Sequence, residues 1–124
     1  MKIQASAEDY LESILVLSKK NGKVRSIDIA KHMGFSKPTI SIIMKQFRDN
    51  GYIVIDEDRN IHLTDKGAEI ATGIHERHML LSKVLAAIGV DEETAMADAC
   101  KIEHNISEKT FLCIKAFFEK MQNI

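Results

Sequence analysis

Hydrophobic residues recur at helical spacing along most of this 124-residue chain. Apolar positions three and four residues apart are typical of helices with one buried face. They predict helices over residues 6–21, 26–33, 37–50, 65–87, 91–104 and 107–122. Residues 52–64 differ, because two short runs rich in β-branched residues surround a polar turn, which indicates a β-hairpin. The predicted fold class is therefore mainly α.

Serine and glycine mark the ends of the first three predicted helices. A serine hydroxyl accepts a hydrogen bond from a free N–H group at a helix start, and glycine readily takes the left-handed conformation that ends a helix. Pro38 falls in the first turn of the third helix, where its missing N–H costs little. The serines are Ser6, Ser26 and Ser36, and the glycines are Gly22, Gly34 and Gly51.

The order helix, short helix, tight turn, helix and hairpin is that of a winged helix-turn-helix. In that fold the second helix of the turn motif, here 37–50, enters the major groove of DNA. Its apolar face is expected to pack on the core through Ile40, Ile43, Met44 and Phe47. The alternative is a small helical bundle whose exposed helix happens to be polar, but the hairpin favours the DNA-binding interpretation.

The other positions of this helix are the candidate DNA contacts. Small hydroxyl groups among lysines suit close approach to base edges and phosphates. The predicted contacts are Ser36, Lys37, Pro38, Thr39, Ser41, Ile42 and Lys45, together with Arg59 at the tip of the hairpin. The neighbouring acids Asp56, Glu57 and Asp58 are expected to weaken the contact that Arg59 makes.

Composition places the chain among ordinary soluble globular proteins, with 45% hydrophobic and 28% charged residues and a formal net charge of -1. Residues 1–64 carry 10 Lys and Arg against 8 Asp and Glu, whereas residues 65–124 carry 7 against 10. Two cysteines cannot form a disulfide framework, and the sequence has no apolar signal core and no membrane-spanning run. We therefore expect a cytoplasmic protein with reduced thiols and no membrane partner.

Cys100, Glu103 and His104 place a thiol, a carboxylate and an imidazole at helical positions i, i+3 and i+4. On a helix these offsets bring the three side chains to one face, where they can converge on one cation. Thiolate and imidazole are ligands of iron, cobalt, nickel and zinc. The alternative is a half-buried cysteine beside a solvated pair of polar residues.

Two further groups of candidate ligands lie on other predicted helices. Asp9 and Glu12 are three residues apart on the first helix, so both carboxylates can face one point, although acids in a first turn also favour the helix dipole. His75 and His78 are three residues apart on the fourth helix, where surface histidines of an amphipathic helix are the alternative. Spacing alone leaves these alternatives open.

A series of short motifs runs in order along residues 5–107. They are Glu8-Asp9-Tyr10-Leu11-Glu12, Ser36-Lys37-Pro38-Thr39-Ile40, Leu63-Thr64-Asp65-Lys66-Gly67, Arg77-His78, Ile88-Gly89-Val90-Asp91 and Ala99-Cys100-Lys101-Ile102-Glu103-His104-Asn105-Ile106-Ser107. Together they resemble the metal-dependent repressors of the diphtheria toxin repressor and manganese transport regulator (DtxR/MntR) family. The resemblance implies a winged helix-turn-helix DNA-binding domain over 1–64, a helical metal-binding and dimerisation domain over 65–124, and a divalent metal that switches DNA binding on.

The resemblance also implies a set of metal ligands. They are Asp9, Glu12, His78, Cys100, Glu103 and His104. The set is a hybrid, because Cys100 stands where the manganese type has a carboxylate, and Asp9 stands where the iron type has a methionine. Ser82 and Met96 replace ligands of the iron type's second site, so we expect that site to be absent in its iron-type form. His75 matches no ligand of the family.

Dimerisation is expected from the last helix, which carries more apolar surface than the terminal helix of a small monomer needs. Its apolar residues are Phe111, Leu112, Ile114, Phe117, Phe118 and Met121, and the fourth helix adds Leu80, Leu81, Val84, Leu85 and Ile88. Some of these residues are expected to complete an internal core rather than an interface.

The expected protein is thus not an enzyme but a repressor of metal-homeostasis genes that uses Fe²⁺ or Mn²⁺, with Zn²⁺ or Co²⁺ expected to act in vitro. Without metal the acids and the thiolate would repel one another, so metal binding is expected to dock the first helix and set the spacing of the recognition helices in a homodimer. Those helices must span about 34 Å, one turn of operator DNA. The alternatives are a metal-independent winged-helix regulator and a small zinc hydrolase, although no hydrolase signature occurs.

Overall fold

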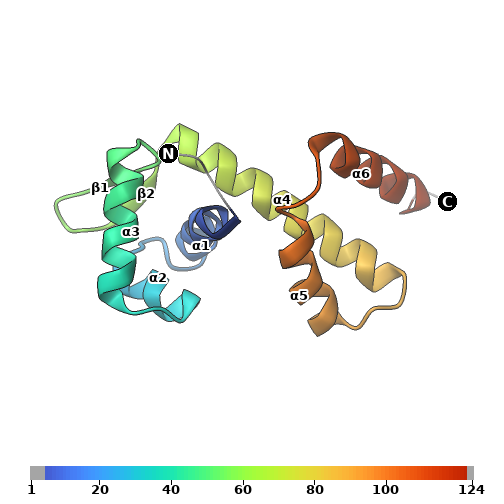
Figure 1. Ribbon diagram of the computed structural model, residues 1–124, viewed down its shortest axis with the longest axis horizontal. Helices are drawn as coiled ribbons and strands as arrows, with labels where there is room; N and C mark the ends of the chain where they lie inside the picture. Colours follow the sequence, from blue (N-terminus) through green and yellow to red (C-terminus); the bar gives the residue numbers. More distant parts are fainter. Residues whose placement is uncertain (1–4, 123–124) are drawn as a thin grey trace. The chain divides into compact units, whose positions relative to one another are not determined.

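The computed structural model describes residues 5–122, and most of them are helical. The elements are α1 (Ala5–Asn21), α2 (Ser26–Met33), α3 (Lys37–Asp49), β1 (Ile53–Ile55), β2 (Ile61–Leu63), α4 (Asp65–Ala87), α5 (Glu92–Ile102) and α6 (Glu108–Gln122) (Figure 1). The mainly α fold class, with a winged helix-turn-helix followed by further helices, is confirmed. The helix bounds lie within two residues of the predicted ones.

The chain forms two compact units, Met1–Gly73 and Ile74–Ile124, and the boundary between them falls within α4. The first four residues, on which the expectation of no signal core rests, and the last two lie outside the described residues. Among the residues that the structure describes, no helix combines the length and the apolar character needed to span a lipid bilayer.

The start of α3 is capped as the sequence predicts. Ser36 Oγ accepts a hydrogen bond from the Thr39 N–H at 3.3 Å, and the two hydroxyl groups also bond to each other at 2.8 Å. Gly34, between α2 and α3, takes the left-handed conformation with φ 75°, which lets the chain leave α2 and turn sharply into α3. This tight turn holds the two helices as a helix-turn-helix.

Two other predicted caps are wrong. α1 already includes Ala5, a residue of high helix propensity, so Ser6 lies inside its first turn. The N-cap of α2 is Arg25 rather than Ser26. The Asp28 carboxylate accepts the Arg25 N–H at 2.9 Å and thereby satisfies a free donor at the helix start.

The core of the first unit lies among α1, α2, α3 and the start of the hairpin. As predicted, α3 turns an apolar face inward, where Ile40, Met44 and Phe47 are buried, whereas Ile43 is only partly buried at the edge of this core. The Phe47 ring packs edge-on against the rings of Tyr10 and Tyr52, at centroid distances of 6.4 and 6.2 Å. This packing fixes which face of α3 remains exposed.

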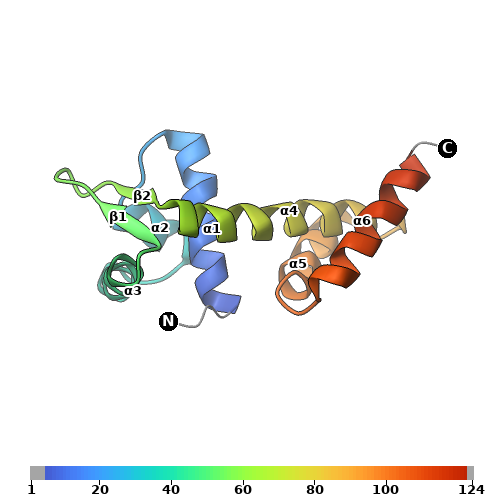
Figure 2. The ribbon, with the colours of Figure 1, turned by 90° about the horizontal axis from the view of Figure 1, so that it is seen from above.

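The predicted hairpin is an antiparallel pair of short strands that projects from this unit (Figures 1 and 2). Ile53 pairs with Leu63 and Ile55 with Ile61. Ile53 and Ile61 are buried while Val54 is exposed, so the hairpin has one face on the core and one face in solvent. The hairpin is therefore anchored at its base and free at its tip, as a wing requires.

The start of α4 is tied closely to the hairpin. The Thr64 hydroxyl donates to the Gly51 carbonyl oxygen at 2.7 Å and accepts the Gly67 N–H at 3.2 Å. A Cβ atom at Gly67 would overlap the Tyr52 carbonyl oxygen, so the backbones approach to a distance that only glycine permits. The first turn of α4 is consequently tied to the first unit.

The second unit contains the later turns of α4 together with α5 and α6. Its buried residues include the small side chains of Ala95 and Ala99 on α5 and the ring of Phe111 on α6. Much apolar surface is left outside, since Ile88 is 73% and Phe117 67% exposed. Ile88 and Phe117 line one apolar groove together with Met121, and apolar side chains exposed together are typical of an interaction surface.

Candidate functional site

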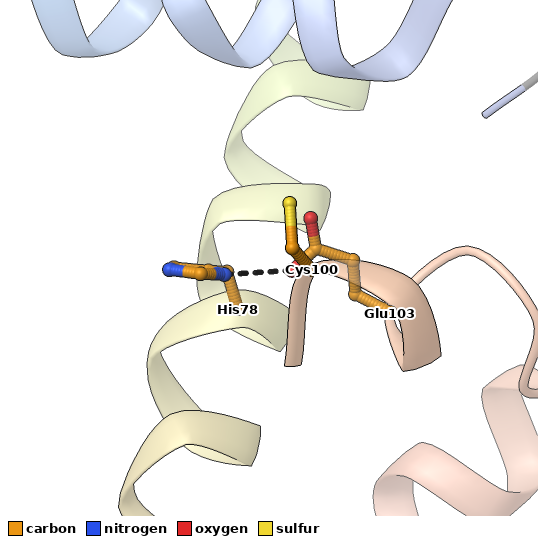
Figure 3. A group of neighbouring side chains, drawn as sticks. All are labelled: His78, Cys100 and Glu103. Atoms are coloured by element: carbon orange, nitrogen blue, oxygen red, sulfur yellow. Dashed lines mark hydrogen bonds and ion pairs between the residues drawn. The ribbon is translucent and has the colours of Figure 1, made fainter. Parts of the chain in front are cut away.

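Three of the predicted ligands come together within the second unit. His78 on α4, Cys100 on α5 and Glu103 just beyond α5 each offer one ligand atom, and these atoms all lie within 4.8 Å of one another (Figure 3). Metal–ligand bonds to nitrogen, oxygen and sulfur are about 2.0–2.3 Å long, so two ligand atoms of one ion lie roughly 3–4.6 Å apart. The geometry therefore suits a shared cation.

The predicted helix over 91–104 is slightly too long, because α5 ends at Ile102. Glu103 nevertheless keeps helical backbone angles, with φ −56° and ψ −26°, and its N–H donates to the Ala99 carbonyl oxygen. Cys100 and Glu103 thus keep the i, i+3 spacing on one helical face. His104 follows in the turn that leads to α6.

Glu103 lies at the centre of the site. Its side chain is fully buried, with 0% exposed. One carboxylate oxygen, Oε2, bonds to His78 Nδ1 at 3.0 Å, and the other, Oε1, lies 3.4 Å from His104 Nε2. A buried carboxylate needs a positive partner, which a protonated imidazole or a metal cation supplies.

The donor set fits a divalent transition metal. It combines a thiol, a carboxylate and an imidazole, with the His104 imidazole 3.4 Å from the same carboxylate, and iron, cobalt and zinc bind this mixture of ligands more strongly than manganese does. The bond between His78 and Glu103 also leaves the second nitrogen of that ring, Nε2, outside the pair. The structure thus brings His78, Cys100 and Glu103 together as candidate metal ligands.

The remaining predicted ligands, Asp9 and Glu12, are half-buried residues one turn apart on α1. They belong to the first unit, and their part in the metal centre stays a prediction. Helical spacing alone did not show whether His75 or His78 is the candidate ligand. The fold brings His78, from α4, to Cys100 and Glu103.

A basic groove of about 550 Å³ lies in the first unit between the start of α2, the exposed face of α3 and the hairpin. Its cationic lining residues are Arg25, Lys37, Lys45, Arg48 and Arg59. Ser41 lies among them, and no acidic residue lines the groove in the described part of the chain. Its mixture of cations and a small hydroxyl suits phosphates and base edges.

Two of these cations, Arg25 and Arg48, were missed in the sequence. Arg48 lies one turn after Lys45 on α3, so helical spacing could have indicated it. Arg25 gave no such signal, because its place in the groove depends on how the start of α2 packs beside α3. Its Nε atom donates to the Asn60 side chain at 3.4 Å, which links it to the hairpin.

The other predicted DNA contacts lie at the start of α3 and are exposed: Ser36, Pro38, Thr39 and Ile42. Ile42 is 62% exposed, so its apolar side chain lies on the solvent face of α3 and not in the core. An exposed apolar group at this place is suited to contact with a thymine methyl group.

Asp56, one of the three acids beside Arg59, forms hydrogen bonds within the hairpin turn. Its Oδ1 atom accepts the N–H groups of Asp58 and Asn60, each at 2.9 Å, and Oδ2 bonds to His62 Nε2 at 2.9 Å. The hydrogen bonds from His62 and from the backbone lower the pKa of Asp56. Asp56 thus holds the turn in which Arg59 takes a left-handed conformation with φ 65°.

Two family profiles cover nearly the whole chain. The one described as iron dependent repressor, N-terminal DNA binding domain, matches residues 2–61, and the one described as iron dependent repressor, metal binding and dimerisation domain, matches residues 64–123. The chain belongs to the iron-dependent repressor family. The resemblance to DtxR/MntR repressors that the motifs indicated is confirmed.

Individual relatives agree with this family. The transcriptional regulator MntR of Escherichia coli is 34% identical over 113 residues, which are 91% of this chain and 73% of that protein. A manganese-dependent transcriptional repressor in complex with manganese is 27% identical, with a TM-score of 0.78 over 88% of this chain and 50% of that one. The manganese regulator SloR has the same fold at 24% identity, with a TM-score of 0.78 over 96% of this chain and 55% of that one. The chain spans about half the length of these two solved structures.

The family is one of metal-dependent, DNA-binding transcriptional repressors. The two alternatives considered from the sequence, a metal-independent regulator and a zinc hydrolase, are not favoured by these matches.

Proposed function

We propose that this chain is a divalent-metal-dependent repressor that binds operator DNA as a homodimer and controls genes of metal homeostasis. The observation that carries the proposal is the buried Glu103 carboxylate, bonded to His78 and within reach of Cys100. A winged helix-turn-helix with a basic groove precedes this site in the same chain. The functional division we propose, 1–64 and 65–124, agrees with the spans of the two family profiles.

The full ligand set we propose is His78, Cys100, Glu103 and His104, joined by Asp9 and Glu12 from α1. The acids and an ionised thiol bring negative charges together, and a bound divalent ion would neutralise them. Without that neutralisation, Asp9 and Glu12 would repel Glu103 if all three served as ligands of one centre. α1 packs against α2 within the DNA-binding unit, so fixing α1 would fix where α3 is held.

The proposed switch must control the distance between the two recognition helices, because they bind successive turns of DNA. In a two-fold dimer the helices must be about 34 Å apart. Metal binding that holds α1 in one place would select this separation, which couples the metal site to the DNA site through a movable element. The charge pattern of the ligands and the position of α1 in its unit support this mechanism.

The homodimer we propose uses the apolar face of α4 and α6. A groove of about 520 Å³ between these helices is lined mainly by carbon, with Val84 and Ile88 on one side and Ile114, Phe117 and Met121 on the other. The exposed area of Ile88 and Phe117 supports an interface here.

For the metal we propose Fe²⁺ or Mn²⁺, with Fe²⁺ narrowly preferred because Cys100 supplies a soft ligand. Relatives named for manganese support Mn²⁺, and the profiles named for iron support Fe²⁺. Asp9 and Glu12, both hard oxygen ligands, would favour Mn²⁺ more than a set without them.

The test begins with the metal content of the chain purified without oxygen. Duplexes that bind it are then selected from a random-sequence pool, once with Fe²⁺ and once with Mn²⁺, and their affinity is measured with metal and with excess chelator. We expect metal to strengthen binding by roughly tenfold to a hundredfold, the usual range of such coupling. Equal affinity in both conditions would identify a metal-independent regulator instead.

The groove residues give a separate prediction. Lys45→Ala should weaken binding to selected and to random duplexes alike, and should lower the salt slope by about one, because one phosphate contact is lost. Ser41→Ala should leave the salt slope unchanged and reduce discrimination between the two duplexes, by about 1–3 kcal/mol if the hydroxyl reads a base edge. Fluorescence anisotropy at several salt concentrations measures both effects.

The control is Lys109→Ala, which removes an exposed lysine from α6 and should change neither quantity. If Ser41→Ala and Lys45→Ala had the same effect on both duplexes, the assignment of base-facing and phosphate-facing residues on α3 would be wrong.

A further inference from the structure

The Arg77 side chain joins α4 to the turn between α5 and α6. Its Nη1 atom donates to the carbonyl oxygens of Glu103 at 3.1 Å and Ile106 at 2.8 Å. Its Nη2 atom bonds to the Glu108 carboxylate at 2.8 Å. The guanidinium carbon lies 5.2 Å from the centre of the Phe111 ring. One side chain thus contacts the end of α5, the turn and the first turn of α6.

The geometry is suited to a guanidinium group in particular. The Glu103 carbonyl lies at the C-terminal end of α5, the negative end of the helix dipole, and the Ile106 carbonyl lies in the turn beyond it. Arg77 is only 16% exposed, so its hydrogen bonds to these carbonyls are shielded from water. A lysine has one compact charged group and cannot span two carbonyls and a carboxylate in the same plane.

Arg77 and His78 are consecutive on α4, and both hold Glu103. Arg77 bonds to its backbone carbonyl, and His78 bonds to its carboxylate. The backbone and the side chain of this proposed ligand are therefore both attached to α4. His104, the next residue, lies in the turn that Arg77 spans from Glu103 to Ile106.

We propose that Arg77 is a positioning residue of the metal centre, which fixes the end of α5 so that Glu103 and His104 are presented toward His78 and Cys100. This inference rests on the proposed metal-dependent function. Arg77 itself is not a ligand, because a guanidinium is always charged and has no lone pair to offer. It acts by restricting the conformations of the turn between α5 and α6 in the metal-free protein.

Loss of this support should lower metal affinity without removing a ligand. Residues that orient ligands typically change metal affinity by about 10- to 100-fold when they are replaced. Arg77→Met keeps the length of the side chain and its packing on Phe111, but removes all three hydrogen-bonding interactions. Arg77→Lys keeps the charge and is expected to restore part of the affinity.

The experiment measures Co²⁺ binding to the full chain by competition with a chromophoric chelator and by the absorption spectrum of the Co²⁺ complex. Wild-type protein should show a thiolate-to-Co²⁺ charge-transfer band from Cys100. Arg77→Met should bind Co²⁺ about 10- to 100-fold more weakly and, at saturating Co²⁺, show altered d–d bands. A purely structural role would reduce the folded fraction without altering the spectrum of the folded complex, so circular dichroism in excess chelator is recorded alongside.

Glu108→Gln is the matched control, because it removes only the ion pair to a carboxylate that is 70% exposed. It should retain wild-type affinity and spectrum. The inference is overturned if folded Arg77→Met matches wild type in both Co²⁺ affinity and absorption spectrum. If Arg77→Met does not fold, the same comparison is made with Arg77→Lys. The inference is equally overturned if Glu108→Gln causes the same loss. Absence of Co²⁺ binding by wild-type protein would instead refute the proposed metal-dependent function.

Discussion

Replacing Glu103 by glutamine is expected to abolish metal-stimulated DNA binding while the chain remains folded. Glutamine preserves the shape of this fully buried side chain and can still bond to His78, but it loses the negative charge and is a poor metal ligand. Because Glu103 is a proposed ligand that also contacts two imidazoles, we expect metal affinity to fall by roughly a hundredfold or more, beyond the usual effect of an orienting residue.

The measurement is a metal titration of DNA binding, accompanied by a thermal melt in chelator. His104→Ala should act in the same direction, since it removes the imidazole 3.4 Å from Glu103 Oε1. Glu93→Gln, at an exposed acid in the first turn of α5, is the control and should leave the midpoint unchanged. A Glu103→Gln variant with a normal, metal-dependent midpoint would show that the site has been placed wrongly.

Replacing Cys100 by glutamate should change which metal activates the protein. A thiolate strengthens binding of Fe²⁺, Co²⁺ and Zn²⁺ more than that of Mn²⁺, whereas a carboxylate suits Mn²⁺. The substitution keeps the charge of the ligand set. We therefore expect the ratio of Zn²⁺ to Mn²⁺ affinity to fall by about tenfold or more, which corresponds to about 1.4 kcal/mol, and activation to shift toward Mn²⁺.

Two further variants decide whether the thiol is a ligand. Cys100→Ala should give a protein that metal activates poorly, and Glu93→Gln, at an exposed acid in the first turn of α5, should behave as wild type. If Cys100→Ala were fully activated and Cys100→Glu left the order of metals untouched, selectivity would belong to Asp9 and Glu12, with the thiol as a bystander. Binding of each metal is measured by competition with a chromophoric chelator without oxygen.

The site combines a local signal with contacts that arise only on folding. Cys100 and Glu103 were placed on one face by their spacing, and the structure keeps them there even though α5 ends before Glu103. The meeting of this face with α4 depends on the packing of the second unit, in which Ala95 and Ala99 of α5 are buried. That packing brings His78 to the acid and gives the buried carboxylate its partner.

Local periodicity was enough to determine the helices, the hairpin and the core face of α3, because a helix repeats every 3.6 residues and a buried stripe must follow that repeat. Ile40, Met44 and Phe47 were assigned to the core for this reason and are buried. The cap at Ser36 was equally local, since its partner lies three residues away. The caps predicted at Ser6 and Ser26 were wrong. In α1 the preceding residue, Ala5, is already helical, and in α2 the preceding residue, Arg25, is the N-cap.

Contacts between separate elements were decided only by the tertiary structure. Spacing could not choose between His75 and His78, because both lie on α4 and only the position of α5 beside that helix makes one of them a partner of Glu103. Arg25 likewise lines the basic groove only because α2 and the hairpin are placed beside α3 in the folded structure. The bonds of Arg77 to a turn some 26 to 31 residues further along the chain left no local trace at all, because hydrogen bonds over such a separation depend on where packed helices meet and not on any repeat within them.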